Sequence, residues 1–253
     1  MTEKLKHKIK QIEEMILHTF RESGCKGIVV GMSGGIDSSV AAALCCRAIG
    51  PNLVLGLSLP SRLNSVNDIQ DVVTLCTNLG MEHHIYGIEP ILWAFKERPG
   101  FTVSHYLIGN LTARIRMVVL YYHANRDNRL VCGTSNLSEY LLGYCTKFGD
   151  SAGDIEPILH LYKTDVYEMA KELGIPEQII KKVPSAGLWA GQSDEGEIGF
   201  TYNEIDSALK NLESNNWNAK TTTEERILTL VRKNAHKSLP APSLLTHNVL
   251  SFG

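Results

Sequence analysis

The stretch Gly27-Ile28-Val29-Val30-Gly31-Met32-Ser33-Gly34-Gly35-Ile36-Asp37-Ser38 decides the fold of this chain. It begins as a short apolar run, passes through a turn of serines and glycines, and opens a helix-compatible segment from Val40 to Ala48. The N–H groups at the start of a helix point outward, and the helix dipole favours negative charge there. Adjacent glycines let the backbone approach phosphate oxygens without a Cβ in the way. The stretch therefore predicts a strand, an anion-binding loop and a helix.

This loop is not a Walker phosphate loop, because no Gly-Lys-Ser/Thr follows its glycines. Its serines add hydroxyl donors, and Asp37 adds a carboxylate that can hold Mg²⁺. The hexapeptide Ser33-Gly34-Gly35-Ile36-Asp37-Ser38 resembles the signature of the ATP pyrophosphatases, enzymes that cleave ATP between the α and β phosphates. The alternative interpretation is a Gly/Ser turn that only joins a strand to a helix.

The composition is that of a globular protein. The 253 residues are 43% hydrophobic and 21% charged, which suits one large or two small domains. A net charge of −2 argues against broad nucleic-acid binding. No apolar run has membrane-spanning length and the N-terminal stretch is charged, so we expect a cytoplasmic protein. The six cysteines lack metal-binding spacing, and we expect unreactive thiols in a reducing compartment.

Strand and helix patterns alternate along the first part of the chain. Apolar runs predict strands at 26–31, 53–59, 82–86 and 129–132, and helical periodicity predicts helices at 3–22, 40–48, 67–79 and 106–124. This order predicts an α/β fold with a doubly wound, Rossmann-like parallel sheet flanked by helices. Loops after the first and fourth strands then lie at the carboxyl edge of the sheet. We therefore expect Ser33–Ser39 and Thr134–Glu139 to face one pocket.

The remaining sequence predicts a helical C-terminal portion. Helical patterns occupy 163–173, 176–182, 202–212 and 222–233. Between them, Pro184–Glu197 holds four Gly or Pro residues among polar ones and is the best candidate for a mobile lid. We expect a single domain over 1–253, with an N-terminal helix, a core at 25–165, and a helical and lid region at 166–253.

Several blocks between residues 27 and 240 resemble the ammonia-dependent NAD synthetases, a family of the ATP pyrophosphatase (PP-loop) superfamily. After the loop, these blocks are Asn110–Met117, Gly133–Glu139, Thr146–Asp150, Gly153–Ile158, Leu161–Thr164, Pro184–Trp189, Gln192–Glu195 and His236-Lys237. The resemblance implies a carbon–nitrogen ligase that amidates deamido-NAD⁺ with ammonia through an adenylated carboxylate. ATP and Mg²⁺ would be used, and AMP and pyrophosphate released. It also implies a homodimer with the dinucleotide site at the subunit interface, and no glutaminase domain, since the loop lies so near the start of the sequence.

The resemblance also implies roles for individual residues. Those expected to contact ATP are Gly31, Met32, Ser33, Gly34, Gly35, Ile36, Asp37, Ser38, Thr134, Lys163 and Ser185. Asp37 and Glu139 would hold Mg²⁺ and, with Lys163, form the catalytic set. Hard oxygens suit Mg²⁺, and a lysine can neutralise charge on the leaving pyrophosphate. Those expected to bind deamido-NAD⁺ are Arg114, Lys147, Asp154, His236 and Lys237. Cations suit its phosphates and carboxylate, and an aspartate suits ribose hydroxyls.

Each assignment has an ordinary structural alternative. Arg114 and Arg116 can line the solvated face of a helix. Lys147 and Asp150 can form a surface ion pair of little energetic value. Glu139 can be an exposed helix residue, and the basic pair at 236–237 can belong to a flexible tail.

Four further positions bear on the site. Arg62, after Pro60-Ser61, can reach ATP from the loop after the second strand, and Asp150 is a candidate base for ammonium. Two residues depart from the family pattern: Phe148 stands where tyrosine is common, and Ala190 where proline is common. Both departures put local loop geometry in question more than function.

Other functions share the first motif. GMP synthetase subunits and argininosuccinate or asparagine synthetases are expected to lack the blocks at 146–154 and 184–195. A tRNA-modifying relative is expected to carry a basic extension or suitably placed cysteines, and neither is evident. Outside enzymes, a nucleotide sensor can bind ATP without turnover, but it does not need both Asp37 and Glu139.

Overall fold

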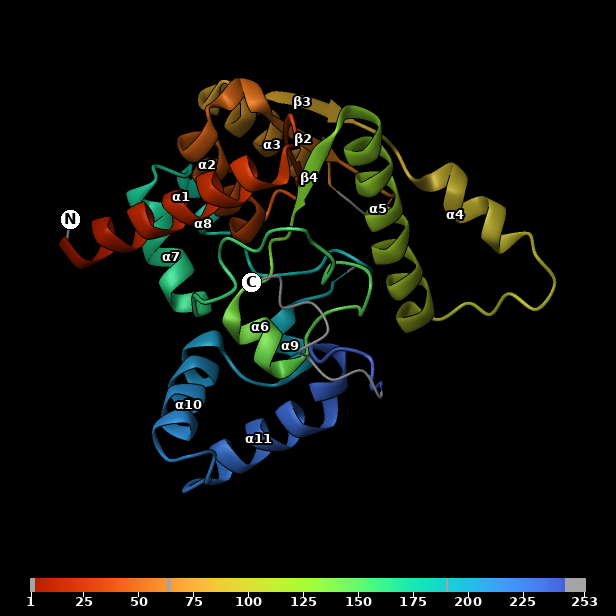
Figure 1. Ribbon diagram of the computed structural model, residues 1–253. Helices are drawn as coiled ribbons and strands as arrows, with labels where there is room; N and C mark the ends of the chain where they lie inside the picture. Colours follow the sequence, from red (N-terminus) through yellow and green to blue (C-terminus); the bar gives the residue numbers. More distant parts are fainter. Residues whose placement is uncertain (1–2, 63–64, 190, 244–253) are drawn as a thin grey trace.

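A four-stranded parallel sheet forms the centre of the computed structural model, which describes residues 3–62, 65–189 and 191–243 (Figure 1). The strands are β1 (Gly27–Gly31), β2 (Val54–Ser58), β3 (Glu82–Ile85) and β4 (Arg129–Cys132), in the order β3-β2-β1-β4. The chain moves outward from β1 to β3 and then places β4 on the other side of β1. The order therefore reverses at β1, so the loops after β1 and β4 are neighbours, as predicted.

The strand side chains alternate between two helical layers. Ile28 and Val30 pack with α1 (Glu3–Ser23), α2 (Ile36–Ile49), α3 (Val66–Leu79) and α7 (Lys163–Glu172). Val29, between them, packs with α4 (Glu89–Lys96) and α5 (His105–Asp127). Figure 1 shows α5 on one side of the sheet and α1, α2 and α3 on the other. The doubly wound arrangement predicted from the sequence is confirmed.

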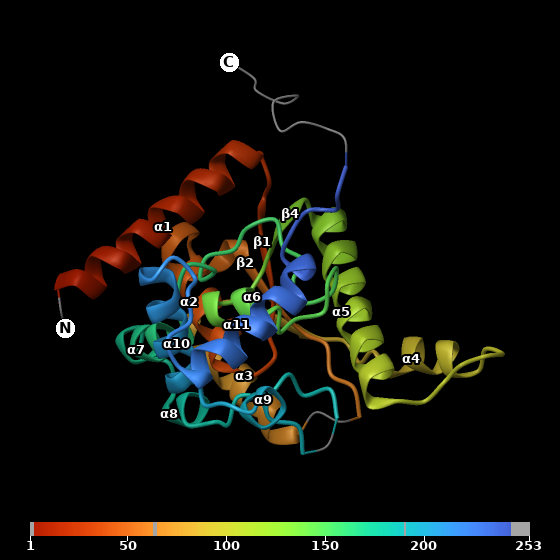
Figure 2. The same cartoon turned by 90° about the horizontal axis from the view of Figure 1, so that it is seen from below.

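Three helices make a separate cluster beyond the carboxyl end of the sheet: α6 (Leu137–Leu142), α10 (Tyr202–Ser214) and α11 (Thr222–Asn234). Their core contains Ile205, Leu209, Leu212 and Ile227, none of which is exposed to solvent. Figure 2 shows α10 and α11 covering this end of the molecule. This is the helical C-terminal portion that the sequence predicts.

The sequence does not predict the short helices correctly. α4, α6 and α9 (Asp194–Ile198) were missed, and α8 (Glu177–Ile180) is shorter than the predicted 176–182. Elements of four to eight residues complete at most about two turns, too few to establish a helical period. The remaining short elements are two 3-10 turns, η1 (Pro51–Leu53) and η2 (Ala235–Lys237).

The helices and the cysteines agree with what the composition predicts. Among the described ranges, no helix is both long and apolar enough to cross a bilayer. All six cysteines are free, and Cys45, Cys46, Cys76 and Cys132 are buried. Burial raises the pKa of the Cys76 thiol to about 11, which disfavours the reactive thiolate.

Candidate active site

A cavity of about 640 Å³ opens at the carboxyl edge of the sheet. The complete loop Gly31–Ser38 lines it after β1, and Gly133, Thr134 and Glu139 line it after β4. Lys163 and Ser185 complete the set of residues predicted to contact ATP. The predicted meeting of the two loops is therefore present, and every one of those residues lies on the wall of one cavity.

The loop after β1 is shaped by its serines and by one glycine. Ser33 Oγ accepts the Gly35 N–H at 3.1 Å, and the Ser39 hydroxyl donates to Gly35 O at 2.7 Å. Gly34 has a φ of +81°, and a Cβ there would lie 3.0 Å from the Asp68 carbonyl oxygen. The N-cap of α2 is Gly35, so no side chain caps the first helical N–H groups. The loop is therefore held in place while the first N–H groups of α2 remain available to an anion.

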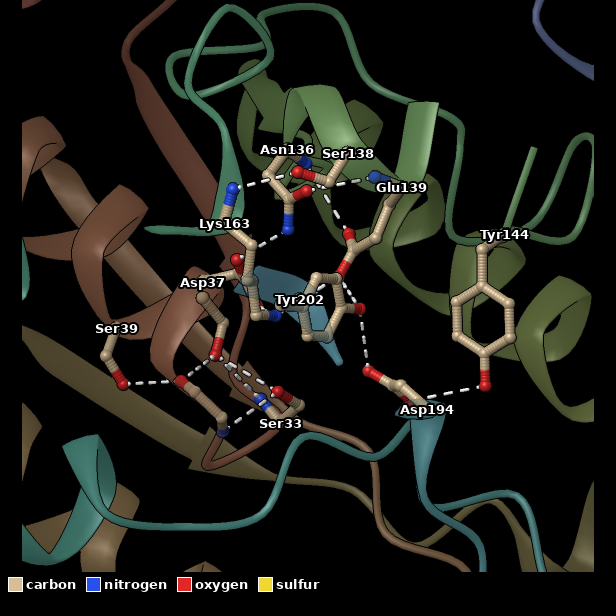
Figure 3. A network of polar contacts seen from close by, with 12 residues as sticks. Ser33, Asp37, Ser39, Asn136, Ser138, Glu139, Tyr144, Lys163, Asp194 and Tyr202 are labelled. Atoms are coloured by element: carbon tan, nitrogen blue, oxygen red, sulfur yellow. Dashed lines mark hydrogen bonds and ion pairs between the residues drawn. The ribbon is translucent and has the colours of Figure 1, made fainter. Parts of the chain in front are cut away.

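The buried ammonium of Lys163 joins the two loops (Figure 3). Its Nζ lies 2.6 Å from Asp37 Oδ2 and 3.2 Å from Glu139 Oε1, and the Lys163 side chain is 2% exposed. Asn136 Nδ2 donates to Asp37 Oδ1 at 2.9 Å. The Glu139 side chain is 17% exposed, so the alternative of an exposed helix residue is wrong.

Burial and charge set the protonation of this cluster. Burial raises the pKa of Glu139 to about 7, the carboxylates of Asp37 and Asp194 act in the same direction, and Lys163 opposes them. Burial alone would lower the pKa of Lys163, but Asp37 and Glu139 outweigh it and raise that pKa. Lys163 therefore stays positively charged at the place where phosphates would enter.

Tyr202 lies against the same cluster and was not predicted. Lys163 Nζ is 4.9 Å from the centre of its ring. The Tyr202 hydroxyl is 3.1 Å from Asp194 Oδ2 and 3.4 Å from Glu139 Oε1, and Asp194 also accepts from the Tyr144 hydroxyl (Figure 3). Asp194 begins α9 within the 184–197 segment, so Tyr202 joins that segment to the cluster. In the sequence Tyr202 has the appearance of an ordinary apolar helix residue.

Lys182, two residues before the 184–197 segment, bonds to the Gly31–Ser38 loop and to α3. Its Nζ donates to Asp68 and Asp71 of α3 at 2.8 Å each, and to Gly34 O at 3.1 Å. Both carboxylates raise the pKa of Lys182 against the effect of burial. The sequence contains no motif around Lys182 that points to this contact.

The candidate lid lines the cavity with Pro184–Trp189, Gly191 and Gln192. Gln192 Oε1 accepts the Leu188 N–H at 2.7 Å, and Asp194 N–H donates to Pro184 O at 3.0 Å. These contacts fold the segment back on itself. Ala190, one of the two departures from the family pattern, lies outside the described residues.

Four of the five residues predicted to bind deamido-NAD⁺ lie together. Arg114 donates to Lys147 O at 3.3 Å, and Lys147 Nζ donates to His236 O at 2.5 Å. Lys237 Nζ reaches Gly143 O at 2.9 Å. Lys237 lines the cavity, whereas Arg114, Lys147 and His236 do not. The amines of Lys147 and Lys237 thus hold the C-terminal segment against the 143–147 loop.

Asp154, the fifth residue, is held apart from this group. Its carboxylate accepts from Val131 N–H at 2.8 Å and from the Tyr121 hydroxyl at 3.2 Å. These bonds fix it beside β4, outside the cavity wall. Its predicted role depends on substrate reaching that position.

The structure decides some of the alternatives. Arg116 is half-buried, lines the cavity and donates to Leu59 O at 3.1 Å, so the interpretation that it lies on a solvated helix face is wrong. Arg114 is exposed, as that interpretation predicts. Lys147 bonds to backbone carbonyls in place of a surface ion pair with Asp150.

Two other candidate positions do not line the cavity. Arg62 does not line the cavity; its guanidinium lies 5.2 Å from the centre of the Trp93 ring. Phe148 is exposed, has a φ of +59°, and lies under Lys147 Nζ.

Asp37 and Glu139 have the donor chemistry for a magnesium ion. In the described part of the chain, no group of three or more His, Cys, Asp or Glu residues has metal-site geometry. Mg²⁺ bound together with ATP phosphates usually needs one or two protein carboxylates. Asp37 Oδ2 and Glu139 Oε1 both lie within 3.2 Å of Lys163 Nζ, so the two carboxylates are close enough together at the cavity wall to share a cation. These two residues therefore fit the ion.

Sequence comparison matches the NAD synthase family model to residues 8–241. The NH(3)-dependent NAD(+) synthetase of Methanoregula boonei is 62% identical over 246 residues, covering 97% of this chain and 99% of that protein. That of Methanocaldococcus jannaschii is 42% identical over 252 residues, covering 95% and 97%. The resemblance inferred from the motifs is confirmed.

Two solved structures share the fold. The NMN synthetase from Francisella tularensis has a TM-score of 0.87 at 38% identity, covering 94% of this chain and 98% of that one. The NH3-dependent NAD synthetase from Campylobacter jejuni, in complex with the nitrate ion, has a TM-score of 0.81 at 35% identity, covering 96% and 99%. By its motifs, its sheet topology and these likenesses, the chain belongs to the NAD synthase family.

Proposed function

We propose that this protein amidates deamido-NAD⁺ with ammonia, consuming ATP and releasing NAD⁺, AMP and pyrophosphate. The observation that carries the proposal is the convergence of Lys163, Asp37 and Glu139 on the wall of the cavity formed by the two loops. The names of relatives that are 62% and 42% identical over nearly the whole chain support the same reaction.

The residues divide the work by position. The loop Gly31–Ser38 supplies N–H and hydroxyl donors for the ATP phosphates, and Thr134 and Ser185 add hydroxyls from elsewhere on the cavity wall. The carboxylate of deamido-NAD⁺ attacks the α-phosphorus, and Lys163 stabilises the charge that accumulates on the departing pyrophosphate. Ammonia then attacks the adenylated carbonyl, and AMP leaves. The protein contributes orientation and charge, with no covalent enzyme intermediate required.

Asp37 and Glu139 would hold Mg²⁺, whose charge would offset that of the ATP phosphates. Lys163 would keep its positive charge beside them, since both acids favour the charged form. The 184–197 segment would close over the cavity and exclude water from the adenylate.

The mononucleotide is a second candidate acceptor. The structural likeness with a TM-score of 0.87 is to a protein named NMN synthetase, whose product carries no AMP half. Purified protein with Mg-ATP and ammonium should be given deamido-NAD⁺ and nicotinate mononucleotide in turn. We expect kcat/KM to favour the dinucleotide, and a preference for the mononucleotide would replace the proposed acceptor.

Asp150 is proposed as the base that takes a proton from ammonium. It lines the cavity, and Oδ1 accepts the Thr146 N–H at 2.8 Å. Burial raises the pKa of Asp150, and this hydrogen bond opposes the rise. A carboxylate with a raised pKa is a stronger base than an ordinary one, yet it is lost when pH falls through that pKa.

Asp150→Asn should lower kcat by about 100-fold near neutral pH, where ammonium predominates over free ammonia. The deficit should shrink as pH rises, because free ammonia then needs no base. A pH profile of kcat for both proteins measures this, with Asp127→Asn at the end of α5 as the control. A deficit that is the same at all pH values would contradict the base role.

We further propose a homodimer formed through α5. Leu107, Arg114, Val118 and Tyr122 are exposed and lie within about a quarter of the helix circumference. Val118 is 59% and Tyr122 is 65% exposed, unusual values for apolar residues. Arg114 would then face the partner, in agreement with a dinucleotide site at the interface.

Val118→Glu should convert the dimer to a monomer, because two carboxylates would be brought into an apolar interface. Sedimentation analysis of the wild type and the variant at equal concentration measures this. Met15→Glu on α1 is the matched control, since Met15 is also an exposed apolar residue, at 37%. A monomeric wild type, or a dimeric Val118→Glu, would contradict the interface.

A further inference from the structure

A buried carboxylate outside the cavity holds the backbone that carries the catalytic residues. Asp206 of α10 is 1% exposed, and Ser138 of α6 is not exposed at all. The Ser138 hydroxyl donates to Asp206 Oδ1, and Ser138 Oγ in turn accepts the Lys163 N–H at 2.9 Å. Asp206 Oδ2 accepts the Thr164 N–H at 2.8 Å. We name these two side chains the Ser138–Asp206 clamp.

The clamp acts at a helix start that lacks its own cap. The N-cap of α7 is Tyr162, which makes no side-chain capping bond. The first N–H groups of α7, those of Lys163 and Thr164, are taken by the clamp instead. A carboxylate at this position also interacts favourably with the helix dipole. The buried charge of Asp206 is thus balanced by N–H donors and the Ser138 hydroxyl.

The residues whose backbone the clamp fixes are catalytic ones. The Lys163 N–H donates one of the bonds itself, and Glu139 follows Ser138 in the sequence (Figure 3). A third contact, Leu137 N–H to Leu161 O at 2.8 Å, joins the same two segments. A shift of α7 relative to α6 would therefore separate the Lys163 ammonium from Glu139.

We propose that Asp206 is a positioning residue, which acts through Ser138 and Thr164 to set the Lys163 ammonium against Glu139 and the leaving pyrophosphate. The inference rests on the proposed function for the roles of Lys163 and Glu139. Asp206 itself contacts no substrate. Its effect should appear in turnover more than in the amount of folded protein.

Asp206→Asn tests the clamp. An amide has one oxygen, so it cannot accept from both Ser138 and Thr164, and its NH₂ group must face one of the two. We expect kcat to fall on the order of 100-fold, the scale of a misplacement of about 1 Å. Ser138→Ala removes the other half of the clamp without changing a charge and should lower kcat in the same way.

Glu224→Gln is the matched control. Glu224 is also a buried carboxylate that accepts a backbone N–H, that of Lys220 at 2.7 Å, but it belongs to α11. Thermal unfolding and the binding stoichiometry of a non-hydrolysable ATP analogue should be measured for all variants. One analogue bound per chain shows that the protein is folded, so a lower kcat then indicates a change in the position of Lys163 relative to Glu139.

The decisive readout is a double-mutant cycle with Lys163→Met. If Asp206 acts through Lys163, adding Asp206→Asn to Lys163→Met should cost no further activity, while adding Glu224→Gln should act independently. Additive losses for Asp206→Asn, or equal losses for Asp206→Asn and Glu224→Gln, would overturn the proposal.

A wild-type chain that binds the analogue but forms no NAD⁺ would refute the proposed function by itself. The affinity of each variant for the ATP analogue would then test the clamp. Asp206→Asn should weaken that affinity on the order of tenfold relative to Glu224→Gln, because Lys163 is displaced from the phosphates. Equal affinities would overturn the clamp.

Discussion

Lys163→Met should lower kcat on the order of 10³-fold, with a smaller change in KM for ATP. In the proposed mechanism the lost ammonium stabilises charge that develops on the pyrophosphate as the bond to the α-phosphorus breaks, where the transition state gains more than the ground state. Steady-state release of AMP, measured at saturating ammonium, gives both constants.

The same change should destabilise the folded protein by about 3–5 kcal/mol, because Asp37 and Glu139 would lose the partner of their buried charges. Urea unfolding measures this. Lys163→Arg is the matched variant: it keeps the charge but exchanges a point charge for a planar fork. Relative to Lys163→Met, Lys163→Arg should recover part of the free energy of unfolding but little of kcat. A Lys163→Met protein with more than a tenth of wild-type kcat would contradict the catalytic role.

Gly34→Ala should weaken ATP binding on the order of 100-fold. A Cβ at this position would be 3.0 Å from the Asp68 carbonyl oxygen, and the φ of +81° is unfavourable for alanine. The loop must therefore shift, and the loss of two hydrogen bonds to charged phosphates amounts to about 3 kcal/mol. Calorimetric titration with a non-hydrolysable ATP analogue measures the change.

Substitutions at two other glycines distinguish the effect of backbone strain from the effect of a Cβ in the loop. Gly50 at the end of α2 has a φ of +91°, and a Cβ there would meet nothing within 4 Å, so Gly50→Ala should cost stability without weakening ATP binding. Gly35, with a φ of −90°, lies in the same loop but has ordinary backbone geometry. Its Cβ would meet Ser33 Oγ at 3.2 Å, so Gly35→Ala should weaken binding less than Gly34→Ala. Equal affinities of Gly34→Ala and the wild type for the ATP analogue would contradict the proposed phosphate-binding role of the Gly31–Ser38 loop.

The sheet and the loop residues that line the cavity could be predicted because their signals are local. The apolar run of β1 and the glycines after it occur within twelve residues, and parallel topology then requires the β1 and β4 loops to meet. Lys163 and Glu139 followed from the matched family motifs. The cavity contains them all.

The supporting contacts could not be predicted because they join residues distant in sequence that have no special local pattern. Tyr202 and Asp206 lie on α10, where each fits an ordinary amphipathic helix, and their partners Glu139 and Ser138 lie on α6. Lys182 resembles any surface lysine until α3 places Asp68 and Asp71 beside it. The packing of α6, α7 and α10 creates the first two contacts, and the packing of the chain at Lys182 against α3 creates the third. A single sequence does not encode either packing as a motif.

The most direct test of the central claim is to follow NAD⁺ and AMP together in purified protein supplied with Mg-ATP, deamido-NAD⁺ and ammonium. We predict that the two products appear in equal amounts and that neither forms at a comparable rate without ammonium. AMP formed without NAD⁺ in the presence of all substrates would contradict the claim, because the adenylated carboxylate would then not be the species that ammonia attacks.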